Sequence, residues 1–137
     1  VRENCASAES SFAGELTEED RVMLKKVVEA IRAKIKVPCT GCRYCMPCPK
    51  GVDIPGTFAA YNDRYSDGWF TAQKEHIMGT LMRKEKTSAS QCIECGACER
   101  HCPQGIAIRE ELKNARKVVE GTVYKVAAKV LPIVMKY

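Results

Sequence analysis

Eight of the nine cysteines in this chain of 137 residues lie in two short segments that repeat one pattern. In each segment, three cysteines follow one another at intervals of three residues, and a fourth comes directly before a proline. The two sets are Cys39, Cys42, Cys45 and Cys48 in the first segment and Cys92, Cys95, Cys98 and Cys102 in the second. The first segment is one residue shorter before its last cysteine. Any fold of this chain must therefore accommodate two groups of four thiols.

This spacing is the ligand pattern of a pair of cubane [4Fe–4S] clusters. A cubane needs four soft, deprotonated ligands, and cysteines three residues apart in a tight loop reach three of its corners. The small residues Gly41, Gly96 and Ala97 suit the sharp turns of such a loop. A structural zinc site is the main alternative, because Cys-x₂-Cys pairs also bind zinc. Four cysteines per segment, each set ending in Cys-Pro, favour iron–sulfur clusters over zinc.

The composition favours a reducing compartment. Nine cysteines in 137 residues fall short of the density of a disulfide scaffold. The start of the chain, Val1–Cys5, carries charges and lacks the apolar stretch of a signal peptide. The longest apolar run, Val123–Met135, is too short and too interrupted for a membrane span. We therefore expect a cytoplasmic protein without a membrane partner, in which clustered cysteines bind metal and do not form disulfide bonds.

The net charge of +5 does not indicate nucleic-acid binding. Each oxidised cluster with its four thiolates carries about −2, so two clusters would bring the total to about +1. The basic residues are also scattered along the sequence, without the clustering on one face that nucleic acid requires. We therefore expect no nucleic-acid partner.

Apolar residues recur at helical spacing, and no segment alternates with the period of a strand, so we expect an all-α domain. Thr17 and the acidic residues after it predict a helix start, and Val37–Pro38 predicts its end. The stripe of this helix, which we interpret as core, consists of Leu24, Val27, Val28, Ile31 and Ile35.

Further helices are expected after each cysteine segment. One opens at Ile54-Pro55 and fades at 65–68, and the next runs from about Trp69 to Lys86. Beyond Pro103, Gly121 separates two stripes, which we interpret as core or as a docking face. The stripes consist of Ile108, Leu112, Ala115 and Val119, and of Val123, Val126, Ala127, Val130 and Val134.

The residues around the cysteines resemble those of known families. The second segment with the following Gln104–Ile108 resembles the bacterial-type ferredoxin repeat, and the 43 residues between Cys48 and Cys92 are similar to the α-helical ferredoxin branch. More closely, Pro38–Pro55, with Phe58 and Tyr61-Asn62 behind it, resembles the C-terminal domain of ferredoxin-fused aldo/keto reductases. The resemblance covers roughly residues 15–110 and implies an α-helical ferredoxin-like domain with two cluster-binding loops between helices.

The resemblance also implies a ligand set. In two-cluster ferredoxins, the cysteine before the proline ligates the cluster of the other segment. One cluster would then be held by Cys39, Cys42, Cys45 and Cys102, and the second by Cys92, Cys95, Cys98 and Cys48.

In the reductase family, a (β/α)₈ barrel that binds a nicotinamide cofactor precedes this domain. Residues 1–15 would be the tail of that barrel and residues 16–137 the di-cluster domain, with Glu3 and Asn4 near the adenine of NADP(H). The catalytic residues of the barrel lie outside this chain, so we expect no catalytic residue here. The expected role is electron transfer between a redox partner protein and the oxidoreductase barrel.

A few residues carry separate expectations. We interpret Cys5 as a spare, partly buried thiol and His76 as a surface side chain, and we expect Tyr44 and Trp69 either in the core or over a cluster. Four charged or polar residues adjoin the ligands and either tune the clusters or are simply solvated: Arg43, Lys50, Arg100 and His101.

Overall fold

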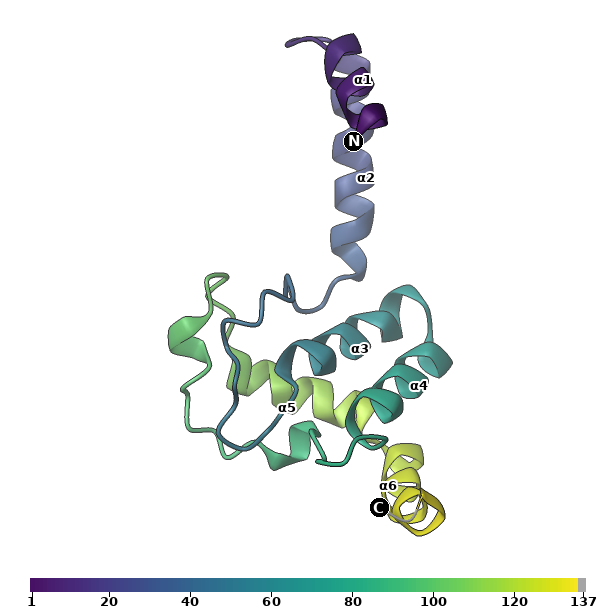
Figure 1. Ribbon diagram of the computed structural model, residues 1–137, viewed down its shortest axis with the longest axis vertical. Helices are drawn as coiled ribbons and strands as arrows, with labels where there is room; N and C mark the ends of the chain where they lie inside the picture. Colours follow the sequence, from purple (N-terminus) through teal and green to yellow (C-terminus); the bar gives the residue numbers. More distant parts are fainter. Residues whose placement is uncertain (136–137) are drawn as a thin grey trace. The chain divides into compact units, whose positions relative to one another are not determined.

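A computed structural model describes residues 1–135 of the chain (Figure 1). The expected all-α class is confirmed, because every regular element in the described residues is a helix. The chain divides into two compact units, residues 1–33 and 34–137. The expected domain boundary near residue 15 concerns a preceding barrel and stays a prediction. The last two residues of the expected 16–137 domain lie outside the described part.

The first unit contains α1 (Arg2–Ser10) and most of α2 (Glu18–Lys34). The predicted start of α2 is confirmed. The backbone N–H and the hydroxyl of Thr17 both donate to Oδ2 of Asp20, over 2.9 and 2.7 Å, and the N–H of Asp20 donates back to Thr17 Oγ1 over 3.2 Å. This reciprocal arrangement satisfies N–H groups that the first turn of a helix leaves without partners.

The interpretation of the α2 stripe as core is wrong. Neither α1 nor α2 contains a buried residue, and the five apolar side chains of the stripe, including Ile35 just after the end of α2, are between 41 and 55% exposed. Two helices in about 33 residues offer too little surface to enclose a core of their own. Cys5, expected to be partly buried, is exposed on α1 for the same reason.

The second unit is built on α3 (Ile54–Ser66), which packs against α4 (Trp69–Thr80) and α5 (Ile108–Val119) (Figure 1). The last helix, α6 (Thr122–Met135), contacts α4. The first cysteine segment leads into α3. The second lies between α4 and α5. The short 3₁₀ helix η1 (Ala89–Gln91) precedes it, and η2 (Glu99–His101) lies within it. The two segments therefore flank the same helical core.

Helix α4 ends at Thr80, well before the predicted end at Lys86. The chain folds back after Thr80, because the N–H of Thr87 donates to Thr80 O over 3.3 Å. The N–H of Asp53 in turn donates to Thr87 O over 3.0 Å. These long-range hydrogen bonds replace the helical ones and bring segment 81–87 beside the start of α3.

The two C-terminal stripes behave differently. The α5 stripe is confirmed as core, since Ile108, Leu112, Ala115 and Val119 are all buried. In α6 only Tyr124 is buried, so the interpretation of that stripe as core is wrong and its role as a docking face stays a prediction. Four of its five residues are exposed: Val123, Val126, Val130 and Val134. None of the described helices is long and apolar enough to cross a membrane.

Candidate metal centre

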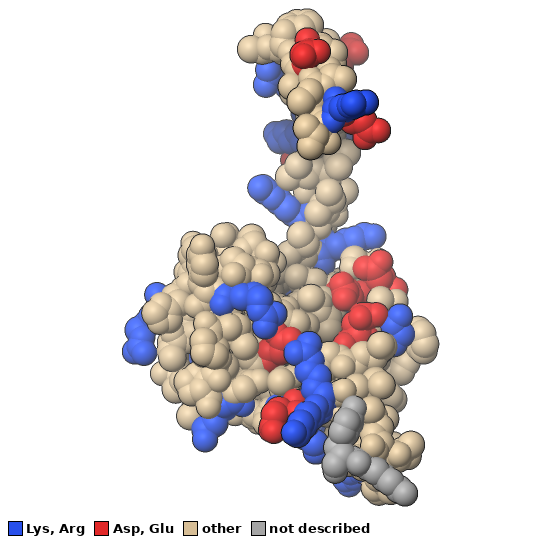
Figure 2. Space-filling view, viewed as in Figure 1, with Lys and Arg blue, Asp and Glu red and all other residues tan. Residues whose placement is uncertain are grey.

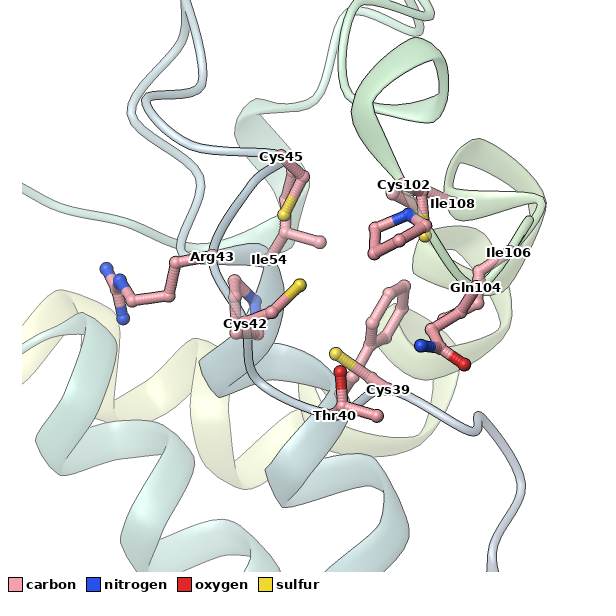
Figure 3. A pocket seen from close by; sticks show the side chains of 13 residues that line it. Cys39, Thr40, Cys42, Arg43, Cys45, Ile54, Cys102, Gln104, Ile106 and Ile108 are labelled. Carbon is pink, nitrogen blue, oxygen red and sulfur yellow. The ribbon is translucent and has the colours of Figure 1, made fainter.

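The structure brings three cysteines of each segment together with the fourth cysteine of the other. One cavity, here called the first cysteine site, is lined by Cys39, Cys42, Cys45 and Cys102. A second cavity, the second cysteine site, is lined by Cys48, Cys92, Cys95 and Cys98. Figure 3 shows the sulfur atoms of the first site facing a shared space.

Apolar side chains form the inner wall of both sites. Ile54, at the start of α3, lines both cavities and is 1% exposed. Phe58 and Ile108 complete the wall of the first site, and Leu112 that of the second, and all three are buried. One isoleucine therefore lines both thiol-lined spaces, which face the same core.

The two cysteine loops share one backbone conformation. The residue before the second cysteine has a positive φ in both loops, +69° at Gly41 and +58° at Glu94. The residue after that cysteine does too, with +64° at Arg43 and +74° at Gly96. Each loop uses glycine at one of these left-handed positions and a larger residue at the other. The repeated sequence pattern thus folds into a repeated turn that directs three thiols to one side.

The side chain of Asn62 fixes the chain just before the first cysteine loop. Its Oδ1 accepts hydrogen bonds from the N–H groups of Lys36 and Val37 over 2.9 and 3.0 Å, and its Nδ2 donates to Val37 O over 2.8 Å. Val37 is fully buried, so its N–H and carbonyl groups have no access to water and depend on hydrogen bonds within the protein. Asn62 entered the sequence analysis only as part of a family resemblance, and no local spacing links it to Val37.

A buried carboxylate fixes the chain before the second cysteine loop. Oε1 of Glu120 accepts from Ala89 N over 2.6 Å, and Oε2 accepts from Ser90 N over 3.2 Å. The N–H of Cys92 donates to Ala89 O over 3.1 Å, so Glu120 anchors the turn from which Cys92 departs. The expectation of a surface His76 is wrong. It is 1% exposed, because its Nε2 faces Glu120 Oε1 at 3.3 Å and Tyr124 packs on its ring.

An ion pair closes the outer edge of the second cysteine site. Nε and Nη2 of Arg109 lie 2.9 and 2.8 Å from Glu99 Oε2, and the N–H of Arg109 donates to Glu99 Oε1 over 2.9 Å. These hydrogen bonds lower the pKa of the Glu99 carboxyl. Arg109 itself lines the second site. The contact holds η2, which precedes Cys102, against the start of α5.

Two thiols are held in an environment that disfavours their charged form. Burial raises the pKa of Cys45, and the neighbouring Cys39, Cys102 and Cys42 add to the effect. Burial and the charge of Glu99 raise the pKa of Cys98 to about 11. Both groups are therefore protonated at neutral pH in the metal-free chain and must release a proton to bind a metal. At the second site, the backbone N–H of Glu94 donates to Cys92 Sγ over 3.4 Å.

The donor set fits an iron–sulfur cluster. Each site offers four cysteine sulfurs, which are the ligands that such clusters use. The thiols surround a space and do not meet at a point: within residues 1–135, no three His, Cys, Asp or Glu side chains are arranged to hold a single metal ion. Which cysteine ligates which cluster stays a prediction.

The remaining expected residues lie elsewhere or at the margins. Glu3 and Asn4 are exposed on α1 in the first unit, and their contact with an adenine ring stays a prediction. Tyr44 and Trp69 are 68 and 46% exposed, so neither belongs to the core. Of the residues that adjoin the cysteines, two line a cavity: Arg43 at the first site and Lys50 at the second, and both are exposed.

Comparison with known proteins bears on the same stretch of chain. Residues 38–107 match the family model described as a 4Fe-4S dicluster domain. No match was found among curated proteins or among solved structures.

Proposed function

The chain belongs to the 4Fe-4S dicluster domain family, and from this premise we propose that it relays single electrons to or from an attached aldo/keto reductase-type oxidoreductase domain. Iron–sulfur clusters are its cofactor, and when bound they supply one-electron transfer. In the proposal, two [4Fe–4S] clusters occupy the two cysteine sites.

The observation that carries the proposal is that eight thiols form two sets of four. The side chain of Ile54 lines both of the sites that they form, so electrons would have to pass only a thin apolar wall between them. The proposed ligands of the first site are Cys39, Cys42, Cys45 and Cys102, and those of the second are Cys92, Cys95, Cys98 and Cys48. Each cluster would then join segments more than 40 residues apart and stabilise the fold as well.

The rest of the chain positions and shields these thiols. Asn62 and Glu120 fix the two approaches to the loops, and Phe58 with Leu112 excludes water from the inner walls. These contacts define where the ligands lie without requiring any nucleophile or base. We therefore assign no catalytic residue to this chain.

The attached reductase domain rests on the resemblance of Pro38–Pro55 and on a surface that such a domain could cover. The apolar stripe of α2 is between 41 and 55% exposed along its length. In the proposal, the barrel packs on this stripe and binds NADP(H), with Glu3 and Asn4 beside the adenine. A redox partner protein exchanges electrons with the clusters. Sequencing the native gene upstream of Val1 tests this part: barrel-coding sequence supports it, and an unrelated upstream domain or a start codon there would end it.

Metal analysis tests the cluster assignment. We expect anaerobic reconstitution of the chain to give about eight iron and eight acid-labile sulfide per chain. Electron paramagnetic resonance after dithionite treatment should then show reduced clusters. Two zinc ions with no sulfide would establish the zinc-stabilised interaction domain in place of the electron-transfer module. Clusters that resist every reductant would mean that they are purely structural.

A further inference from the structure

A group of basic side chains lies in two neighbouring segments, and two of them, Arg43 and Lys50, line the cysteine sites. We call it the basic rim, and it consists of Arg43, Lys50, Arg83, Lys84 and Lys86, all of them exposed. Its two segments are joined at Asp53, whose Oδ1 and Oδ2 lie 3.8 Å from Arg43 and 3.8 Å from Arg83. The hydrogen bond from Asp53 N to Thr87 O also holds the segments together. The two segments of the rim therefore lie side by side.

The basic rim has more positive than negative charge. The two segments of the rim are residues 43–53 and 83–87. They contain two acidic residues, Asp53 and Glu85, and five basic ones. The Asp53 side chain is 10% exposed and is shared by two guanidinium groups. On the face of the second unit shown in Figure 2, a band of Lys and Arg side chains crosses the surface with acidic side chains beside it.

The exposed side of α5 provides a contrast, because three of its four cations each face a carboxylate, whereas Arg43 and Arg83 of the rim share a single one, Asp53. Lys113 lies 2.7 Å from Glu94, Arg109 lies 2.8 Å from Glu99, and Arg116 lies 3.9 Å from Glu120. A protein with an acidic surface would find less uncompensated positive charge there than at the rim. The basic rim offers it several cations at once.

The basic rim also reaches both cysteine sites. Arg43 lines the first site and Lys50 lines the second. Figure 3 shows the guanidinium of Arg43 extending away from the thiols, so its charge faces outward. Tyr44, which follows Arg43, is 68% exposed. Exposed tyrosine and arginine side chains are the residue types that most often anchor protein interfaces.

We propose that the basic rim is the docking surface for an electron-carrier protein with an acidic surface. This inference rests on the proposed function, since it names the surface through which electrons enter or leave. Long-range attraction between the rim and the carrier speeds their encounter and orients the carrier over the cysteine sites. Tyr44 is buried on docking. One electron passes between carrier and domain, so that one is oxidised as the other is reduced.

Binding of a plant-type two-iron ferredoxin, which is acidic, tests the proposal. The reconstituted chain, with its iron and sulfide content measured, is titrated with this probe by calorimetry at low and high salt. We expect binding that weakens with salt, because exposed charges are screened. The double variant Lys84→Glu/Lys86→Glu should weaken binding about tenfold or more at low salt.

A matched control separates the basic rim from net charge. Lys117→Glu/Lys125→Glu makes the same change in charge on α5 and α6, at exposed residues outside the rim. We expect it to weaken binding by less than about threefold. Equal weakening by both double variants would refute the rim as the docking surface. So would the absence of binding at low salt, or binding that salt does not affect.

A second measurement needs no variant and no protein probe. The dithionite-reduced chain is oxidised by hexacyanoferrate(III), an anion, or by hexaamminecobalt(III), a cation, each of which accepts one electron. We expect rising salt to slow the anion and to speed the cation, and the opposite trend would contradict the inference. A chain that binds no reducible cluster fails the proposed function. If the chain holds reducible clusters but neither salt nor the rim variant has the expected effect, only this inference is refuted.

Discussion

The side-chain amide of Asn62 hydrogen-bonds to both the N–H and the carbonyl of Val37, over 3.0 and 2.8 Å. Asn62 lies in α3, and Val37 is two residues before Cys39, the first cysteine of the first loop. The helix therefore fixes the entry to the first cysteine loop through one side chain.

Replacement of Asn62 should loosen that entry. Asn62→Ala leaves the buried N–H of Val37 without a partner, while the Val37 carbonyl keeps its hydrogen bond from Cys39 N over 2.8 Å, so we expect a loss of about 1–3 kcal/mol in the free energy of unfolding. Asn62→Asp keeps the acceptor and loses the donor, and should restore part of the loss. Chemical denaturation of the original chain and the two variants measures the difference in the free energy of unfolding. A variant Asn62→Ala as stable as the original chain would show that the clamp contributes nothing.

Two glycines in helices should respond to alanine in opposite ways. A Cβ at Gly56 would lie 2.7 Å from Asp53 Oδ2, the side chain that caps α3 and faces two arginines. At Gly79 in α4, a Cβ would meet nothing within 4 Å. We expect Gly79→Ala to stabilise by up to about 1 kcal/mol through helix propensity, and Gly56→Ala to destabilise by about 1 kcal/mol through loss of the cap. Thermal unfolding of the two variants measures both changes in stability. If both variants were more stable than the original chain, the close approach of Gly56 to Asp53 would be contradicted.

The left-handed positions of the two loops give a paired prediction. Gly96→Ala places a Cβ at φ +74° and should cost about 1 kcal/mol. Glu94→Gly removes a side chain from φ +58° and should cost nothing beyond its exposed contact with Lys113. Unfolding of the metal-free chain in denaturant measures both, which keeps cluster loss out of the comparison. If Glu94→Gly proved the more damaging variant, the assigned backbone would be wrong.

The start of α2 should depend on pH. Hydrogen bonds from the side chain and backbone of Thr17 lower the pKa of Asp20 below its ordinary value. The ionised carboxylate therefore stabilises the helix start at and above about pH 4, and the effect is lost as pH falls through the lowered pKa. Carbon-detected NMR titration of Asp20, with amide exchange at Thr17, follows the change. In Asp20→Asn this dependence should vanish, and its persistence would place the titrating group elsewhere.

The sequence predicted most of the helices because their boundaries carry local signals. Thr17 with Asp20 and Pro55 after Ile54 marked two helix starts, and Gly121 separated α5 from α6. The end of α4 at Thr80 was not predicted, since the hydrogen bonds around Thr87 that replace the helix come from distant residues. Periodicity alone could not show that the α2 stripe is exposed, because burial depends on what packs against a helix.

The cysteine pattern predicted the kind of site but not what holds it in place. Spacing within one segment shows which thiols lie in one loop. The anchors Asn62 and Glu120 act across 25 and 31 residues on Val37 and Ala89 and leave no trace in local spacing. His76 was misjudged for the same reason, because its partner Glu120 is 44 residues away.

The central claim is that Cys48 and Cys102 each ligate the cluster of the other segment. The iron content of two double variants tests it most directly. If Cys48 and Cys95 belong to one site, Cys48→Ala/Cys95→Ala spares the other site and should retain about four iron and four sulfide per chain. Cys48→Ala/Cys42→Ala then damages both sites and should retain no intact [4Fe–4S] cluster by electron paramagnetic resonance. The reverse result, with the intact cluster in Cys48→Ala/Cys42→Ala and none in Cys48→Ala/Cys95→Ala, would contradict the crossed arrangement.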